Sequence, residues 1–96
     1  MNTNNKPAKF PMGQIVATPA ALQAIQDAQQ TPFEILSRHQ QGDFGEIGKE
    51  DWDANEEALK EGKRLLSAYR TRQNVRIWVI TEWDRSVTTI LLPDEY

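Results

Sequence analysis

Cysteine is absent from the 96-residue sequence, and histidine occurs once. Without cysteine the chain has no disulfide bond, no thiol nucleophile and no Cys-based zinc site, a composition typical of a cytoplasmic protein. A single histidine excludes a metal site built from several histidines of one chain. No apolar run approaches the roughly 20 residues of a membrane-spanning helix, and the first residues lack the basic start and apolar core of a secretory signal. We therefore expect a cytoplasmic protein that uses no metal and no cofactor.

Positive charge is also scarce, since 11 Lys and Arg stand against 14 Asp and Glu, for a net charge of −3. A protein that binds DNA through its phosphates needs a surplus of cations, so broad DNA binding is not expected. Hydrophobic residues make up 39% and charged residues 26% of the chain, which is typical of a folded soluble domain. We expect a flexible, polar N-terminal tail over residues 1–11 and a single domain over residues 12–96.

Two Thr-Pro pairs predict helix starts, because a Thr side chain caps the first turn and proline suits the first helical position. The pairs are Thr18-Pro19 and Thr31-Pro32, and apolar residues follow each at helical spacing. We expect these helices to end near residue 29 and near residue 40. A third, longer helix is predicted over roughly 50–65, with Asn55 on its apolar side.

The last third of the sequence is typical of a β-sheet. Residues 67–71, 75–81 and 87–92 are rich in β-branched and aromatic residues and are separated by polar turns. We predict an α+β fold in which three N-terminal helices pack on a C-terminal three-stranded antiparallel β-meander. The short apolar stretch 14–17 leaves open a fourth strand or a docking segment.

The first concentration of functional side chains spans residues 38–46 and leads into a glycine-rich loop. His39 could transfer protons near neutral pH, or it could simply stabilise the end of its helix. Asp43 and Glu46 could bind a ligand, or they could be a turn residue and a solvated charge. Two carboxylates are too few for a calcium site, which needs about 6–8 oxygen ligands.

The second concentration spans residues 81–89, at the predicted end of a hairpin. Glu82 could act as an acid or base, and Arg85 could bind a phosphate. Asp84, Thr81 and Thr88 would add hydrogen-bonding groups around them. The alternative is a polar hairpin end in which Asp84 and Arg85 form a local ion pair.

Aromatic residues complete the candidate binding set. Tyr69 could stack on a base, although small sheets usually bury such residues in the core. Trp83 lies in the predicted turn and is the aromatic residue least expected to be buried. We expect the clusters 38–46 and 81–89 to meet in space and to form one polar pocket.

From about residue 12 to residue 96 the chain resembles a group of small proteins without an established activity, carried on bacterial plasmids and genomic islands. The stretches that carry this resemblance are 12–19, 38–46, 65–71, 77–82 with 84–86, and 91–96. The resemblance implies an association with mobile genetic elements.

A weaker similarity is to the barnase- and colicin-type ribonucleases, and it rests on His39, the Asp-Phe-Gly of residues 43–45, and a following helix and three strands. This similarity implies cleavage of RNA without a metal. His39 would be the acid or base, Glu82 its partner and Arg85 the phosphate ligand, with Thr81 or Thr88 as a hydrogen-bond donor.

Three functions are compatible with these observations. The first is a binding module that contacts a host, phage or plasmid macromolecule, either protein or RNA, through the hairpin end and the glycine-rich loop. The second is the metal-independent ribonuclease. The third is a structural or regulatory protein whose polar clusters only organise its own fold. No membrane partner is expected.

Overall fold

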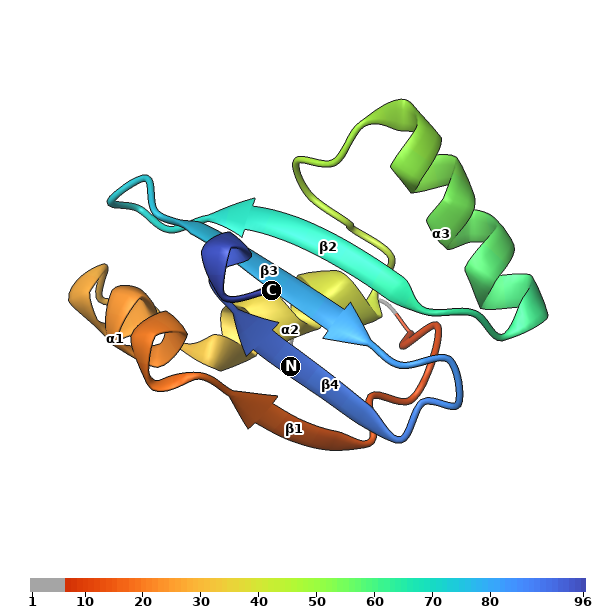
Figure 1. Ribbon diagram of the computed structural model, residues 1–96, viewed down its shortest axis with the longest axis horizontal. Helices are drawn as coiled ribbons and strands as arrows, with labels where there is room; N and C mark the ends of the chain where they lie inside the picture. Colours follow the sequence, from red (N-terminus) through yellow and green to blue (C-terminus); the bar gives the residue numbers. More distant parts are fainter. Residues whose placement is uncertain (1–6) are drawn as a thin grey trace.

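The structure is a computed structural model that describes residues 7–96 (Figure 1). The elements follow in the order β1 (Gln14–Ala17), α1 (Pro19–Asp27), α2 (Pro32–Gln40), α3 (Lys49–Glu61), β2 (Leu65–Arg70), β3 (Arg76–Thr81), β4 (Val87–Leu91) and the 3-10 helix η1 (Pro93–Glu95). Over this part of the chain, no helix has the length and apolar character needed to cross a membrane.

The fold is α+β, but the predicted three-stranded antiparallel meander behind three N-terminal helices was wrong. The sheet has four strands in the order β1-β4-β3-β2, and β1 precedes all three helices in the chain. β1 pairs in parallel with β4, whereas the other neighbours are antiparallel, so the sheet is mixed. The parallel partner of Val16 is Thr89, which is too distant in sequence for local patterning to indicate the pairing.

Thr18 and Thr31 begin their helices as side-chain caps. Their hydroxyl oxygens accept hydrogen bonds from the backbone N–H of Ala21 and Glu34, at 3.1 and 3.4 Å. Each bond satisfies an amide that has no partner within its own helix.

The third helix is shorter than predicted, because it ends at Glu61 rather than near residue 65. Gly62 follows it at φ 72°, a left-handed conformation that ends helices and that glycine adopts without steric cost. β2 begins at Leu65, the last residue of the predicted helix, and therefore two residues before the strand predicted over residues 67–71.

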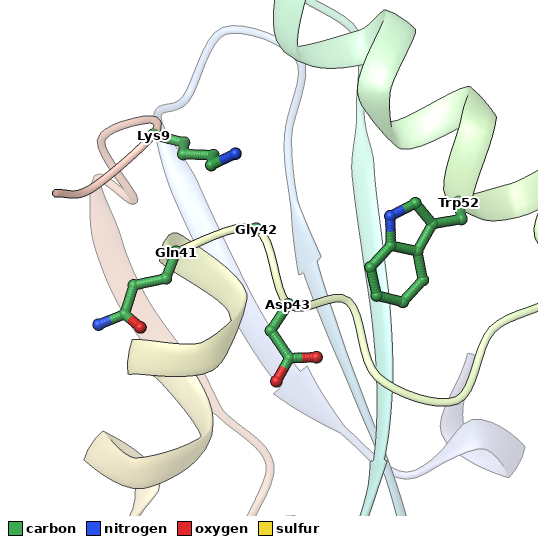
Figure 2. A pocket seen from close by; sticks show the side chains of 5 residues that line it. All are labelled: Lys9, Gln41, Gly42, Asp43 and Trp52. Atoms are coloured by element: carbon green, nitrogen blue, oxygen red, sulfur yellow. The ribbon is translucent and has the colours of Figure 1, made fainter. Parts of the chain in front are cut away.

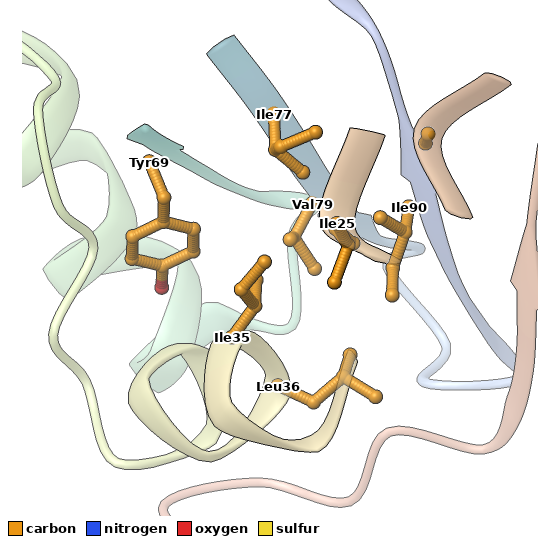
Figure 3. Close-up of a cluster of buried hydrophobic side chains, with 8 residues drawn as sticks. Ile25, Ile35, Leu36, Tyr69, Ile77, Val79 and Ile90 are labelled. Carbon is orange, nitrogen blue, oxygen red and sulfur yellow. The ribbon is translucent and has the colours of Figure 1, made fainter. Parts of the chain in front are cut away.

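Helices α1 and α2 cover one face of the sheet (Figure 3). The core between these layers joins helix residues to strand residues, namely Ile25, Ile35 and Leu36 with Tyr69, Ile77, Val79 and Ile90. Burial of each large aliphatic side chain contributes about 1.5–3 kcal/mol. A second cluster, of Phe10, Phe44, Ala58 and Leu65, packs on one side of this core.

The opposite face of the sheet carries none of the helices α1–α3. Helix η1 lies against β3 on this side, and the ring of Tyr96 is 5.8 Å from the ring of Trp78. We call this side the helix-free face.

The predicted tail, residues 1–11, is only partly described, because residues 1–6 lie outside the described residues. Within the described part, Phe10 is 6% exposed. The backbone N–H of Lys9 donates to the carbonyl of Gln40 at 2.9 Å, and the Gln40 side chain donates to the carbonyl of Phe10. This segment is therefore fastened to the end of α2.

Candidate functional site

His39 lies at the centre of a buried chain of hydrogen bonds. Its side chain has no exposed surface, and its Nδ1 and Nε2 atoms lie 2.6 Å from Ser67 Oγ and 2.8 Å from Thr81 Oγ1. Thr81 Oγ1 is 2.7 Å from Thr88 Oγ1, and the Thr88 hydroxyl donates to the carbonyl of Met12 at 2.7 Å. The chain thus links α2 with β2, β3, β4 and the segment before β1.

The carbonyl at one end of this chain determines the direction of every bond. Because the Met12 carbonyl can only accept, Thr88 donates to it and accepts from Thr81. Thr81 in turn accepts from Nε2–H of His39, which leaves Nδ1 to accept from Ser67. The neutral imidazole with its proton on Nε2 satisfies all these groups.

Protonation of His39 opposes this arrangement. Burial is the main cause, and the positive charge of Arg85 adds to it, so the pKa of His39 falls from 6.5 to about 4. A protonated ring would also force Ser67 to turn its own proton away from Nδ1. His39 is therefore neutral at physiological pH and sealed from solvent, with the ring of Phe10 edge-on to it at 5.1 Å.

Arg85 fastens the β3–β4 turn to the end of α3. Its guanidinium donates to the carbonyls of Lys63, Glu82 and Ala58 at 2.6, 3.0 and 3.0 Å, and more weakly to that of Trp83 at 3.3 Å. Cationic donors at a helix C-terminus stabilise its unpaired carbonyls. Arg85, which the sequence predicted to bind a phosphate, therefore uses both terminal nitrogens of its guanidinium to bind backbone carbonyls in this conformation.

Glu82 lies away from His39 and belongs to a row of side chains on the helix-free face. Glu82 Oε1 is 3.3 Å from Arg64, whose NH1 group donates to the hydroxyl of Tyr96 at 2.5 Å. Tyr96 contacts Trp78. We call Arg64, Glu82, Trp78 and Tyr96 the aromatic strip, in which Tyr96 is 69% exposed; Trp83 lies in the adjoining β3–β4 turn and is 65% exposed.

The glycine-rich loop covers the outer edge of β2. Gly45 has φ 75°, and a Cβ added there would lie 2.1 Å from the carbonyl oxygen of Ala68. This approach lets Ala68 donate to the carbonyl of Phe44 at 3.1 Å and accept from the N–H of Glu46 at 2.6 Å. Glycine is required at this position because both the space and the backbone conformation exclude a side chain.

Asn55 completes the cover of the same edge. Its amide group donates to the carbonyl of Leu66 at 2.7 Å, and its carbonyl oxygen accepts from the N–H of Leu66 at 3.1 Å. The side chain thus replaces a neighbouring strand for one residue of β2.

Asp43 and Tyr69 organise the beginning of the loop. Asp43 pairs with Arg38 at 2.7 Å and accepts from the N–H of Gly45 at 3.1 Å. The Tyr69 hydroxyl donates to the Asp43 carbonyl at 2.6 Å, and burial raises the pKa of Tyr69. Tyr69 is 2% exposed and is not open to a stacking ligand in this conformation.

The remaining predicted binding residues lie at the surface. Glu46 pairs with Arg70 at 2.8 Å. Asp84 accepts from the N–H of Ser86 at 3.0 Å, and hydrogen bonds from the Ser86 side chain and backbone lower the pKa of Asp84. Asp84 therefore forms a turn with Ser86, not the local ion pair with Arg85 that the sequence left open.

A polar pocket of about 360 Å³ lies beside the loop (Figure 2). The residues that line it are Lys9, Gln41, Gly42, Asp43 and Trp52. None of them comes from the hairpin 81–89, so this is not the pocket that the sequence predicted. Within residues 7–96, no group of three or more His, Cys, Asp or Glu side chains could hold a metal ion.

The two predicted clusters do meet, but at a buried position. His39 reaches Thr81 and Thr88, whereas Glu82 points to Arg64. Sequence reasoning missed Ser67, although a polar residue at an inward position of a strand, between Leu65 and Tyr69, is a detectable signal. It also missed Arg64 and Tyr96, which only the tertiary fold brings together.

Comparisons of the chain with protein-family profiles, with curated proteins and with solved structures found no match.

Proposed function

We propose that the protein is a cytoplasmic binding module that contacts a protein of its host, of a phage or of a plasmid through the aromatic strip and the neighbouring Trp83. The observation that supports this proposal is the exposure of Tyr96 beside Arg64 on the helix-free face, together with the exposure of Trp83 in the adjoining β3–β4 turn. Trp, Tyr and Arg are the residues most enriched among those that dominate the energy of protein interfaces.

The strip is also pre-organised for binding. Arg64 is held between Glu82 and Tyr96, and Tyr96 packs edge-on to Trp78 with an interplanar angle of 62°. Side chains that are already held in place lose little conformational entropy when a partner binds. Such a surface gives a rigid aromatic anchor rather than a catalytic cavity.

Site-specific photo-crosslinking in cells tests this proposal. A photoreactive amino acid at position 83 should form an adduct with one partner protein. The same amino acid at position 33, where Phe33 is 75% exposed on α2, serves as the control and should not. Excess unmodified protein should compete for the adduct at 83, and Tyr96→Ala should reduce it.

Two outcomes contradict the proposal. One is an adduct of equal yield at positions 33 and 83, which would indicate unspecific contact. The other is an adduct whose added mass ribonuclease removes, because the partner would then be RNA.

The metal-independent ribonuclease is the second candidate, and one observation favours it. His39, Thr81 and Thr88 gather within hydrogen-bonding distance, and Arg85 lies near enough for its charge to lower the pKa of His39. Catalysis would require Phe10 to leave its position against the His39 ring, since RNA cannot otherwise reach it.

The test for this candidate uses a mixed RNA pool with EDTA present. If the protein is a ribonuclease, its products should carry 2′,3′-cyclic phosphate ends. The Phe10→Ala variant should cleave RNA faster than the wild type, and the double variant Phe10→Ala/His39→Asn should be inactive. If the wild type and Phe10→Ala both leave the RNA intact, this candidate is rejected.

A further inference from the structure

The two edges of the sheet differ in whether their backbone groups are hydrogen-bonded to other parts of the chain. The outer edge of β2 is covered, because Asn55 binds both backbone groups of Leu66, and the loop residues Phe44 and Glu46 bind those of Ala68. Natural proteins cover sheet edges in this way because an open edge can pair with another strand.

Within residues 7–96, nothing covers the outer edge of β1 in this way. The backbone N–H of Gln14 donates to the carbonyl of Ser86, in the turn before β4, and that of Thr18 donates to the carbonyl of Ile90 in β4, both at 3.0 Å. Since alternate residues of a parallel strand bond to the same neighbour, the N–H and C=O groups of Ile15 and Ala17 point to the free edge. Among residues 7–96 no strand pairs there (Figure 1), and Val16 is 38% exposed.

The second unusual property of this edge is the absence of charge. No charged residue occurs from Phe10 to Gln26, although 26% of the whole chain is charged. Edge strands are commonly protected by lysine or other charged side chains, and β1 has none. In a two-fold interface the residue at the axis meets its own counterpart, so a charge there would repel itself, and an uncharged strand avoids this cost.

We infer that β1 pairs with β1 of a second copy of this chain, in antiparallel orientation about a two-fold axis. One register pairs all the free groups of both residues: Ile15 of one copy exchanges both backbone hydrogen bonds with Ala17 of the other. Val16 then lies on the axis, opposite its own counterpart, where side chains of a non-hydrogen-bonded pair approach closely. The two four-stranded sheets become one continuous sheet.

Analytical ultracentrifugation of the full chain over a range of concentrations tests this pairing. The wild type should form a species of twice the chain mass of 11.0 kDa. Val16→Lys alone and Val16→Glu alone should each weaken dimerisation about a hundred-fold, because like charges would face each other across the axis. An equimolar mixture of the two variants should restore the dimer.

Phe33→Lys is the matched control, since it also places lysine at an exposed apolar position but lies on α2. It should leave the dimer unchanged. Hydrogen exchange supplies a second measurement: the amides of Ile15 and Ala17 should be protected in the wild type and exchange about ten-fold faster or more in Val16→Lys. Thermal melting of each variant shows whether it is folded. If Val16→Lys does not fold, Ile15→Glu replaces it, because the Ile15 side chain is 42% exposed.

A wild type that stays monomeric at high concentration overturns the inference. So does a Val16→Lys dimer as stable as the wild type, because the interface would then lie elsewhere. Fast exchange of the Ile15 and Ala17 amides in a dimer would likewise show that the interface does not include β1, and it would overturn the inference.

Discussion

The buried state of His39 predicts a specific loss of stability in mild acid. The pKa of His39 is about 4 in the folded protein, and the ordinary value is 6.5. Between these two values the unfolded chain binds a proton that the folded protein does not, so stability falls as the pH decreases. One pKa unit corresponds to 1.36 kcal/mol, which gives a loss of about 1.4 kcal/mol at pH ~5.5 and about 2–3 kcal/mol at pH ~4.5. Above pH ~7 the contribution of His39 is fully present.

Urea unfolding at several pH values measures this loss, provided that one protein concentration is used throughout. His39→Gln is the comparison variant, because glutamine keeps a hydrogen-bonding side chain but cannot take up the proton. Its unfolding free energy at neutral pH will be lower than that of the wild type, but its decrease toward pH ~4.5 should be smaller by about 2–3 kcal/mol. The carboxylates titrate in both proteins and cancel in the difference. If wild type and His39→Gln lose the same free energy over this range, His39 is not a buried neutral side chain and the bond directions above are wrong.

Three further substitutions test the structural roles of residues around the glycine-rich loop and the β3–β4 turn. Gly45→Ala should destabilise the protein by about 2 kcal/mol or more in urea unfolding, whereas Gly48→Ala, where a Cβ meets nothing within 4 Å, should change little. Asn55→Ala should lower the free energy of unfolding by about 2–3 kcal/mol, because the N–H and C=O of Leu66 both lose their hydrogen bonds to the Asn55 side chain. Hydrogen exchange of the Leu66 amide should accelerate, and an unchanged rate would show that Asn55 does not protect this edge of β2. Arg85→Ala should cost about 2 kcal/mol and lower the melting temperature, since carbonyls at the end of α3 lose charged donors; an unaltered melting temperature would contradict that role.

Local signals in the sequence predicted the beginnings of α1 and α2 but not the end of α3. A Thr cap followed by proline acts within one helical turn, so Thr18-Pro19 and Thr31-Pro32 are readable without knowledge of the fold. The helix predicted over roughly 50–65 includes Gly62, because Leu59 and Leu66 continue the apolar pattern beyond it. In the structure this apolar pattern belongs to two elements, α3 and β2. The switch from helical to strand spacing at Leu65 involves too few residues to be detected from the sequence.

The pairing of β1 with β4 could not be predicted, because it depends on contacts between the two ends of the chain. The same reason limits what was predicted of the site. Residues of the two clusters were expected to meet, and His39 does reach Thr81, but nothing in the sequence indicated that Phe10 would close over them. A cluster of polar side chains is equally typical of a catalytic site and of a satisfied network that determines strand register.

Self-association and partner binding would be coupled in this protein. A two-fold axis perpendicular to the sheet keeps both helix-free faces on the same side, so the inferred dimer presents two aromatic strips in one direction. A partner that spans both strips binds the second at a high effective concentration, and its affinity for the dimer exceeds that for one chain. Because β1 has only four residues, its pairing alone is modest, and the dimer depends on protein concentration. Linkage then requires that the partner strengthen the dimer by the same factor by which the dimer strengthens partner binding, with no change in the fold of either chain.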